Sequence, residues 1–290
     1  MTWRIVVVSG IAKLDLRLNY LVIRGRDLRK IHLSEISLLV IENTAVSLTA
    51  ALLCELNKRK IKVVFCDERR NPYGELMPYY GSHDSTEKLR VQIKWKADNK
   101  QSVWKEIVRG KIINQRNVLS KYEREQYSML DEYAAKVELN DSTNREGHAA
   151  KVYFNALFGK DFTRHNNDPI NSCLNYGYSV ILSVVNRDIV SAGYFTQLGI
   201  FHDNTYNQYN LGSDLMEPFR PFVDDLVVEM GPEDITSAEK RRLIDLLNKE
   251  VTIDGKKNYL TNAIGIYCRS VLDSVCSGDL SVIKMCEYES

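Results

Sequence analysis

The feature that most constrains the fold is the loss of strand-like sequence near residue 80. Before that point the chain holds short runs rich in β-branched residues, among them WRIVVVSG (3–10), SLLVI (37–41) and IKVVFC (61–66). Such runs are typical of buried strands. After it, strand signals nearly vanish and apolar residues recur at helical spacing. The sequence therefore predicts an α+β protein, with a small β-rich domain at 1–80 and a larger all-helical domain at 81–290.

Three further segments complete the expected N-terminal domain. KLDLRLNYLVIRG (13–25) alternates apolar and charged residues, which predicts a strand with one buried face. Residues 44–60 have helical spacing and end in bases, which suits a helix C-terminus. Residues 67–81 are rich in turn-forming residues and mark the domain boundary. Because so short a segment buries little surface alone, we expect an exposed apolar face that a second subunit covers.

The rest of the chain reads as a succession of helices joined by loops. We expect two long helical stretches in 84–139, a helix at 142–159, a loop at 162–177, a core helix at 178–194, a helix that begins near Thr236 or Ser237, and a last helix within 257–286.

Bulk composition narrows the class of protein. Hydrophobic residues make up 44% of the 290 residues, enough for a real core and against disorder. The six cysteines form no CxxC pair, which indicates thiols in a reducing compartment and not a disulfide framework or zinc cage. No signal peptide is evident, and no run of eighteen apolar residues could span a membrane. We therefore expect a cytoplasmic protein.

Glu146 allows two interpretations. In TNRE, Thr143 and Glu146 fit a capping box, in which each side chain satisfies a backbone donor of the other. The residues after it, however, keep one side of the helix small, which lets a ligand or another backbone approach closely. Glu146 is thus either a helix cap or a functional carboxylate.

His202 lies after an apolar run, in GIFHDN. A lone histidine in such a place is more often a buried, hydrogen-bonded residue than a ligand. It also stands in an expected loop, only fifteen residues before Glu217. Both a structural and a ligand role stay open for it.

Asp214 and Glu217 sit three residues apart in DLMEPFRP, just before an apolar run. A D-x-x-E box at a helix start explains either acid alone. Such a box does not require both acids. Two adjacent carboxylates repel each other unless a cation between them reduces the repulsion. One histidine with two or three carboxylates suits Mn²⁺ or Mg²⁺ better than zinc. The sequence thus permits a metal site here as well as a helix cap.

Charge is unevenly spread along the chain. Residues 88–124 hold eleven lysines and arginines against three acids, whereas 214–254 hold eleven acids against five bases. The basic segment is either a solvated helix face or, with Trp95 and Trp104 interleaved, a surface that holds nucleic acid without reading its sequence. The candidate DNA-binding residues are Lys94, Lys96, Arg109, Lys111, Arg116, Arg164, His165 and Arg220.

At these residues the sequence resembles a known family, the CRISPR-associated integrase Cas1. The resemblance covers essentially the whole chain, and the length and the start MTWRIVVVSGIAKLDL resemble members from type II-A systems. The matching stretches are EGHAAKVYF with Glu146, LNYGYSVILSVV (174–185), GIFHDN with His202, and DLMEPFRPFVDD with Asp214 and Glu217. Some family members have Asp where this chain has Glu217, which leaves open how Asp214 and Glu217 divide their roles.

The resemblance implies a fold and an activity. It implies a β-domain that mediates homodimerisation, and a helical catalytic domain that binds Mn²⁺ or Mg²⁺ through Glu146, His202 and Glu217, with Asp214 nearby. It implies a DNA endonuclease and integrase of CRISPR adaptation. The 3′-hydroxyl of a short double-stranded DNA fragment would attack a phosphodiester at a CRISPR repeat, with the small protein Cas2 bridging two dimers.

Two other functions remain possible from the residues. One is a metal-dependent nuclease that acts alone on branched DNA with the same side chains. The other is a non-catalytic DNA-binding scaffold, in which the acids are helix caps and His202 is a core residue. Metal-dependent cleavage or strand transfer would separate the scaffold from both enzymes, and dependence on a repeat would separate the two enzymes.

Overall fold

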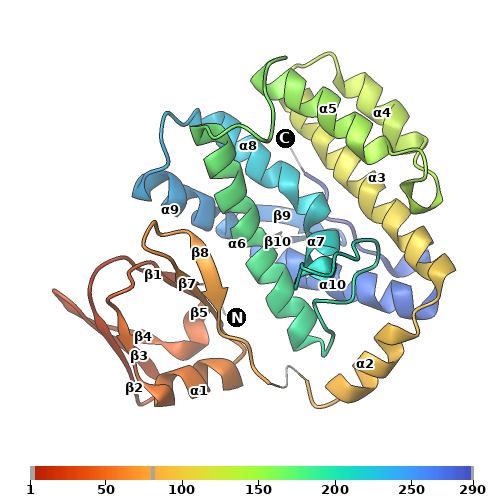
Figure 1. Ribbon diagram of the computed structural model, residues 1–290. Helices are drawn as coiled ribbons and strands as arrows, with labels where there is room; N and C mark the ends of the chain where they lie inside the picture. The colour runs from red at the N-terminus through yellow and green to blue at the C-terminus, as the bar shows by residue number, and fades with distance from the viewer. Residues whose placement is uncertain (1–3, 80–81, 289–290) are drawn as a thin grey trace. The chain divides into compact units, whose positions relative to one another are not determined.

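The computed structural model describes residues 4–79 and 82–288. The chain divides into two compact units, Met1–Gly81 and Ser82–Ser290. Strands dominate the first unit and helices the second (Figure 1). The protein is therefore of mixed α and β structure with N-terminal strands and a mostly helical remainder, as predicted.

Two four-stranded sheets and one helix form the first unit. One sheet has the strand order β1-β5-β7-β8 and the other β4-β3-β2-β6. The strands are β1 (Arg4–Val8), β2 (Lys13–Arg17), β3 (Tyr20–Arg24), β4 (Leu28–His32), β5 (Ile36–Ile41), β6 (Ser47–Leu48), β7 (Lys62–Cys66) and β8 (Pro72–Glu75), and the helix is α1 (Ala50–Lys58).

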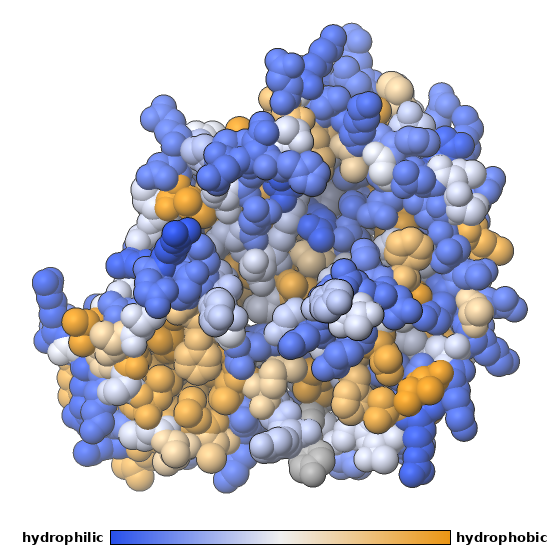
Figure 2. Space-filling model, in the orientation of Figure 1, coloured by the Kyte–Doolittle hydropathy of each residue, from blue (hydrophilic) through white to orange (hydrophobic). Residues whose placement is uncertain are grey.

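The core of this unit explains its strands. β5, the sequence ISLLVI, pairs in parallel with β1 and β7 and is buried at every position, as a central parallel strand without alternation should be. Leu14 and Leu21 from the second sheet and Leu52 from α1 join the same hydrophobic cluster. Other apolar side chains stay exposed, and Figure 2 shows apolar side chains gathered over the face of this unit that is turned to the viewer.

The single strand predicted at 13–25 is instead a hairpin, β2 and β3. The chain reverses at Leu18 and Asn19, whose φ angles of 47° and 67° are the paired positive values of a tight hairpin turn. Leu18 is an unusual residue for such a turn, and no glycine marks the turn in the sequence. The turn-rich segment at 67–81 also contains β8, which was not predicted.

The second unit is built mostly from helices. They are α2 (Ser85–Ile93), α3 (Ala97–Lys121), α4 (Tyr127–Ala135), α5 (Arg145–Phe158), α6 (Pro169–Ser191), α7 (Asn210–Met216), α8 (Arg220–Met230), α9 (Ser237–Asp245) and α10 (Leu260–Ser277). A short 3₁₀ segment, Glu217–Phe219, joins α7 to α8. Among the described residues, no helix is both long and apolar enough to cross a membrane.

The structure corrects three predictions for this unit. It is not all-helical, because β9 (Glu250–Ile253) and β10 (Lys256–Tyr259) form an antiparallel hairpin. Three helices, not two, occupy 84–139. The expected loop at 162–177 is helical from Pro169, because Asp168 accepts from the Asn171 amide as N-cap and proline suits the first turn. The start near Thr236 is confirmed by a capping box with Glu239.

Helices α3 and α6 organise the unit. α3 packs against α4, α5, α8 and α10, and α6 packs against α7, α8, α9 and α10. One stripe of α3 is buried along its length, and its members are Trp104, Val108, Lys111, Gln115 and Val118. Their spacing of three and four residues places them on one helix face. A lysine therefore lies within a buried stripe.

Candidate functional site

Glu146 does not serve as a helix cap. Asn144 is the N-cap of α5 and accepts from the Gly147 amide, while Asp141 accepts from the amides of Arg145 and Glu146. The predicted capping box with Thr143 is therefore wrong, and within the described chain the Thr143 hydroxyl has no hydrogen-bond partner. Because other side chains satisfy the helix start, the Glu146 carboxylate is available for another role.

Asp214 is not a helix cap either. It lies inside α7, and its fully buried carboxylate accepts from the amides of Ile200, Phe201 and His202 at 2.6, 3.0 and 3.0 Å. It also accepts from Nδ1 of His202 at 2.6 Å. Four donors thus surround one carboxylate, which fixes the loop before α7. Asp214 is fully occupied as a hydrogen-bond acceptor and positions His202.

The contact with Asp214 determines the tautomer of the neutral His202 ring and affects its pKa. Because a carboxylate only accepts, Nδ1 carries the proton and the neutral ring keeps its free lone pair on Nε2. The hydrogen bond to Asp214 raises the pKa of His202, against the opposing effect of burial, and the charges of Asp214, Glu217 and Glu146 raise it further. The side chain remains 39% exposed, so His202 is not a core histidine.

Glu217 is buried and held by two cations. Lys111 of α3 donates to its Oε2, and Arg220 donates from Nε to its Oε1 at 2.8 Å. Burial alone would raise the pKa of Glu217, but Arg220 and Lys111 lower it to about 2. From α3, the amide of Asn114 donates to the Pro218 carbonyl at 2.8 Å, which fixes the backbone next to Glu217. The side chain is therefore ionised and well positioned.

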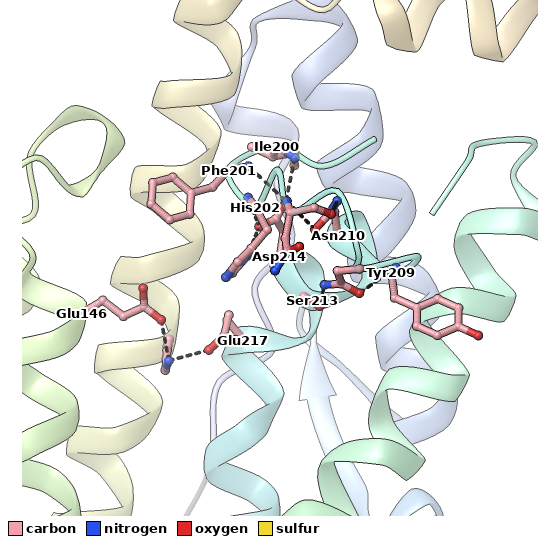
Figure 3. Close-up of polar contacts among 12 residues, drawn as sticks. Glu146, Ile200, Phe201, His202, Tyr209, Asn210, Ser213, Asp214 and Glu217 are labelled. Carbon is pink, nitrogen blue, oxygen red and sulfur yellow. Dashed lines mark hydrogen bonds and ion pairs between the residues drawn. The ribbon is translucent and has the colours of Figure 1, made fainter. Parts of the chain in front are cut away.

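Lys111 joins the two glutamates. Its ammonium donates to Oε1 of Glu146 at 2.6 Å as well as to Glu217, and the residue is 8% exposed. Burial alone would lower the pKa of Lys111, but the charges of Glu217 and Glu146 outweigh it and raise the pKa. Figure 3 shows Glu146 from α5 and Glu217 from the α7–α8 junction pointing toward the same space, with the His202 ring beside them.

Behind Glu217, a second set of buried contacts supports Arg220. The Arg220 guanidinium lies over the Tyr178 ring, 4.5 Å from its centroid, and the Tyr178 hydroxyl donates to Asp224. Burial raises the pKa of Asp224 to about 6. Arg220 was predicted to bind DNA, but this packing and its ion pair place it as a support for Glu217.

The three predicted metal ligands do not form a closed set here. Within residues 4–79 and 82–288, no three His, Cys, Asp or Glu side chains gather closely enough to hold an ion. Instead, the Lys111 ammonium lies between the carboxylates of Glu146 and Glu217 and donates to both. The donor chemistry nevertheless fits a divalent cation, because Glu146 and Glu217 already converge on one positive charge and His202 keeps Nε2 for a ligand.

The other predicted DNA-binding residues differ in their surroundings. Lys94 and Lys96 are exposed and line a cavity of about 270 Å³ together with Arg90 and Trp95. Arg109 and His165 are also exposed.

By contrast, three of the predicted DNA-binding residues are paired or buried. Arg116 pairs with Asp131 at 2.8 Å, Arg164 donates to Asn175 at 2.7 Å, and Lys111 is buried. The prediction that Lys111 offers its charge to DNA phosphates does not match its buried ion pairs.

The sequence does not predict what Lys111 and Asn114 do for the site. The richness of the segment in lysine predicts a basic surface that includes Lys111. Its position in the buried stripe of α3 was a signal that could have placed it inside, since the stripe's other members are apolar or uncharged. No local pattern indicates that Asn114 would hold the Pro218 carbonyl, because that contact joins residues 104 positions apart.

Comparisons with known proteins identify relatives. A family model described as "CRISPR associated protein Cas1" matches residues 5–260. The CRISPR-associated endonuclease Cas1 of Neisseria meningitidis is 33% identical over 261 residues, with 88% of this chain and 86% of the relative covered.

Solved structures share the fold. A casposase bound to integration product superposes with a TM-score of 0.77 at 20% identity, with 97% of this chain and 92% of the casposase chain covered. A Cas6-RT-Cas1–Cas2 complex gives a TM-score of 0.73 at 20% identity, with 99% of this chain but only 36% of the larger chain covered. At such identities the likeness concerns the fold alone.

Asp214→Asn should lower the pKa of His202 toward its ordinary value and destabilise the fold by roughly 2–4 kcal/mol, because the buried carboxylate and its charged hydrogen bonds are lost. The raised pKa means that the His202⁺–Asp214⁻ pair stabilises the folded state fully below about pH 6.5, and that this contribution disappears as the pH rises through the raised value. The stability deficit of the variant should therefore be larger at pH 6 than at pH 9. Histidine NMR titration and urea denaturation measure both effects.

Asp203→Asn is the matched control, since Asp203 is the exposed acid next to His202. It should leave the His202 titration and the urea midpoint nearly unchanged. An unaltered His202 pKa in Asp214→Asn would contradict the assigned hydrogen bond.

Proposed function

The chain belongs to the CRISPR-associated Cas1 family, and we propose that it is a metal-dependent DNA endonuclease and integrase of CRISPR adaptation. The observation that carries this proposal is the convergence of Glu146 and Glu217 on a single cation beside His202, whose ring Asp214 orients. These contacts do not fit a scaffold in which the acids serve only as helix caps, because neither Glu146 nor Asp214 caps its own helix.

The proposed metal ligands are Glu146, His202 and Glu217, and the proposed ion is Mn²⁺ or Mg²⁺. Asp214 acts behind His202 as the carboxylate that fixes the ring and directs Nε2 to the site. When bound, the ion would lower the pKa of the attacking hydroxyl and stabilise the charge that develops at the phosphate. Arg220 and Asn114 would keep Glu217 in place during the reaction.

The proposed reaction is a transesterification. The 3′-hydroxyl of a short double-stranded DNA fragment attacks a phosphodiester at the edge of a CRISPR repeat, one P–O bond forms, and the P–O bond to the neighbouring repeat nucleotide breaks. The number of phosphodiester bonds is unchanged, so the protein must supply positioning and charge stabilisation but no energy source. The likeness in fold to a casposase bound to integration product supports this choice over hydrolysis alone.

The proposed partners follow from the relatives. Homodimers would form through the β-rich unit, and the small protein Cas2 would bridge two dimers, a proposal that the likeness in fold to a chain of the Cas6-RT-Cas1–Cas2 complex supports. The DNA would run over exposed cations that include Lys94, Lys96 and Arg109. Such a protein would act on the chromosomal repeat in the cytoplasm.

Glu217→Gln should reduce strand transfer into a repeat-bearing plasmid by roughly a hundredfold or more, while DNA affinity stays nearly unchanged, because the lost charge matters most in the transition state. The measurement is integration of a labelled DNA fragment in Mn²⁺ and in Mg²⁺, with the dissociation constant determined in parallel. Glu233→Gln, at an exposed glutamate of the same unit, should behave as the wild type.

The same assay tests the other functions. Integration by Glu217→Gln at the wild-type rate would reduce Glu217 to a structural residue and refute the proposed site. Cleavage of branched DNA without any dependence on a repeat would favour a nuclease that acts alone.

Charge reversal at Lys94 and Lys96 together should weaken DNA binding and reduce the slope of log affinity against log salt by about one to two units, because each lost phosphate contact removes nearly one. Binding titrations between ~50 and ~200 mM salt measure this slope. Reversal of Lys256 and Lys257, two exposed lysines of the β9–β10 hairpin, changes the charge equally and should leave the slope unaltered. A normal slope in the Lys94/Lys96 variant would show that these lysines form a solvated face.

Light scattering should show a dimer, with about twice the mass of the 33.3 kDa chain. The reason is the apolar surface left on the small β-rich unit, which includes Ile11 at 73%, Leu28 at 59% and Tyr73 at 86% exposure. A monodisperse monomer throughout the micromolar range would contradict the proposed role of this unit.

A further inference from the structure

Lys111 lies between two of the three side chains that we propose as metal ligands. Its side chain, 10% exposed, extends from the buried stripe of α3 and ends between carboxylates from two other elements, Glu146 of α5 and Glu217 at the α7–α8 junction. An ammonium is a compact point charge with three donors, which lets it imitate a small cation between oxygens.

The charges of the groups ion-paired around Lys111 are balanced without a metal. Glu146 and Glu217 carry two negative charges, and Lys111 and Arg220 carry two positive ones. Asp214, which pairs with the His202 ring beside this set, adds one further negative charge, so a divalent ion would leave one uncompensated positive charge in a largely buried place, which is costly. If the Lys111 ammonium moves away as the ion enters, no excess remains.

We propose that Lys111 is the resident counter-cation of the metal-free site and competes with the divalent ion for Glu146 and Glu217. The inference rests on the proposed metal site and adds to it the residue that sets its affinity. Metal entry is then an exchange of one cation for another at the same two carboxylates. The flexible four-carbon stem of lysine allows the ammonium to leave while its backbone stays in α3.

The exchange has two measurable consequences. Without metal, Lys111 offsets the repulsion between the carboxylates of Glu146 and Glu217 and so contributes to the stability of the fold. When the metal binds, it must displace the ammonium from the two carboxylates, and the loss of those ion pairs reduces the favourable free energy of metal binding. Lys111 therefore lowers metal affinity. Removal of its charge should therefore have opposite effects on the metal-free protein and on metal binding.

The test compares the full-length wild type with Lys111→Met, and measures Mn²⁺ affinity by calorimetry and melting temperature with and without Mn²⁺. The variant should bind Mn²⁺ on the order of tenfold more tightly, because its competitor is gone. Its melting temperature should fall by roughly 5–10 °C without metal and recover most of that loss at saturating Mn²⁺. Lys111→Gln, which can still donate hydrogen bonds to the carboxylates, gives the same comparison in a milder form if the Met variant does not fold.

Two controls separate the possible outcomes. Lys105→Met removes another lysine of α3, one that lies outside the buried stripe, and it should leave metal affinity unchanged. Glu217→Gln should lose Mn²⁺ affinity if the proposed metal site is right. If Glu217→Gln loses Mn²⁺ affinity but neither Lys111 variant gains it, the proposed role of Lys111 as counter-cation is wrong and the proposed metal site stands. Equal Mn²⁺ binding by the wild type and Glu217→Gln would refute the proposed metal site itself.

Discussion

The helical unit depends on how the carboxylates of buried Glu217 and half-buried Glu146 are held close together. They come from different elements, and a shared cation offsets the repulsion between them. Lys111 supplies that cation from the buried stripe of α3. The ion pairs therefore fix three elements together: the start of α5, the middle of α3 and the α7–α8 junction. A site that could accept a metal is thus built into the packing of the helices.

A second buried carboxylate positions the remaining member of the site. Asp214 accepts hydrogen bonds from three consecutive backbone amides and from the His202 ring. These four bonds to one charged carboxylate fix the conformation of the loop that carries His202. Gly199 lies against this arrangement, and a Cβ there would lie 2.3 Å from the His202 carbonyl oxygen and 2.8 Å from the Asp214 carboxylate. Close packing of the loop on Asp214 thus leaves no room for a larger residue. The orientation of the His202 ring is therefore determined by the contacts of its loop with Asp214 and by the close packing at Gly199.

The class of fold and the identity of the polar residues could be predicted from the sequence, because periodicity and composition are local properties. An apolar run predicts β5, and a capping box predicts the start of α9. The roles of the acids could not be predicted in the same way. Asp214 resembled a cap for its own helix, but it binds amides twelve to fourteen residues earlier. Lys111 resembled a surface charge, and only the packing of α3 shows it between Glu146 and Glu217.

Anomalous diffraction from crystals of the protein with Mn²⁺ would locate the ion that we propose Glu146, His202 and Glu217 bind in exchange for the Lys111 ammonium. We expect one manganese peak at about 2.0–2.6 Å from an oxygen of each glutamate and from Nε2 of His202, with the Lys111 ammonium displaced from between the carboxylates. A manganese peak elsewhere, or no peak with Lys111 still paired to both glutamates at saturating Mn²⁺, would contradict it.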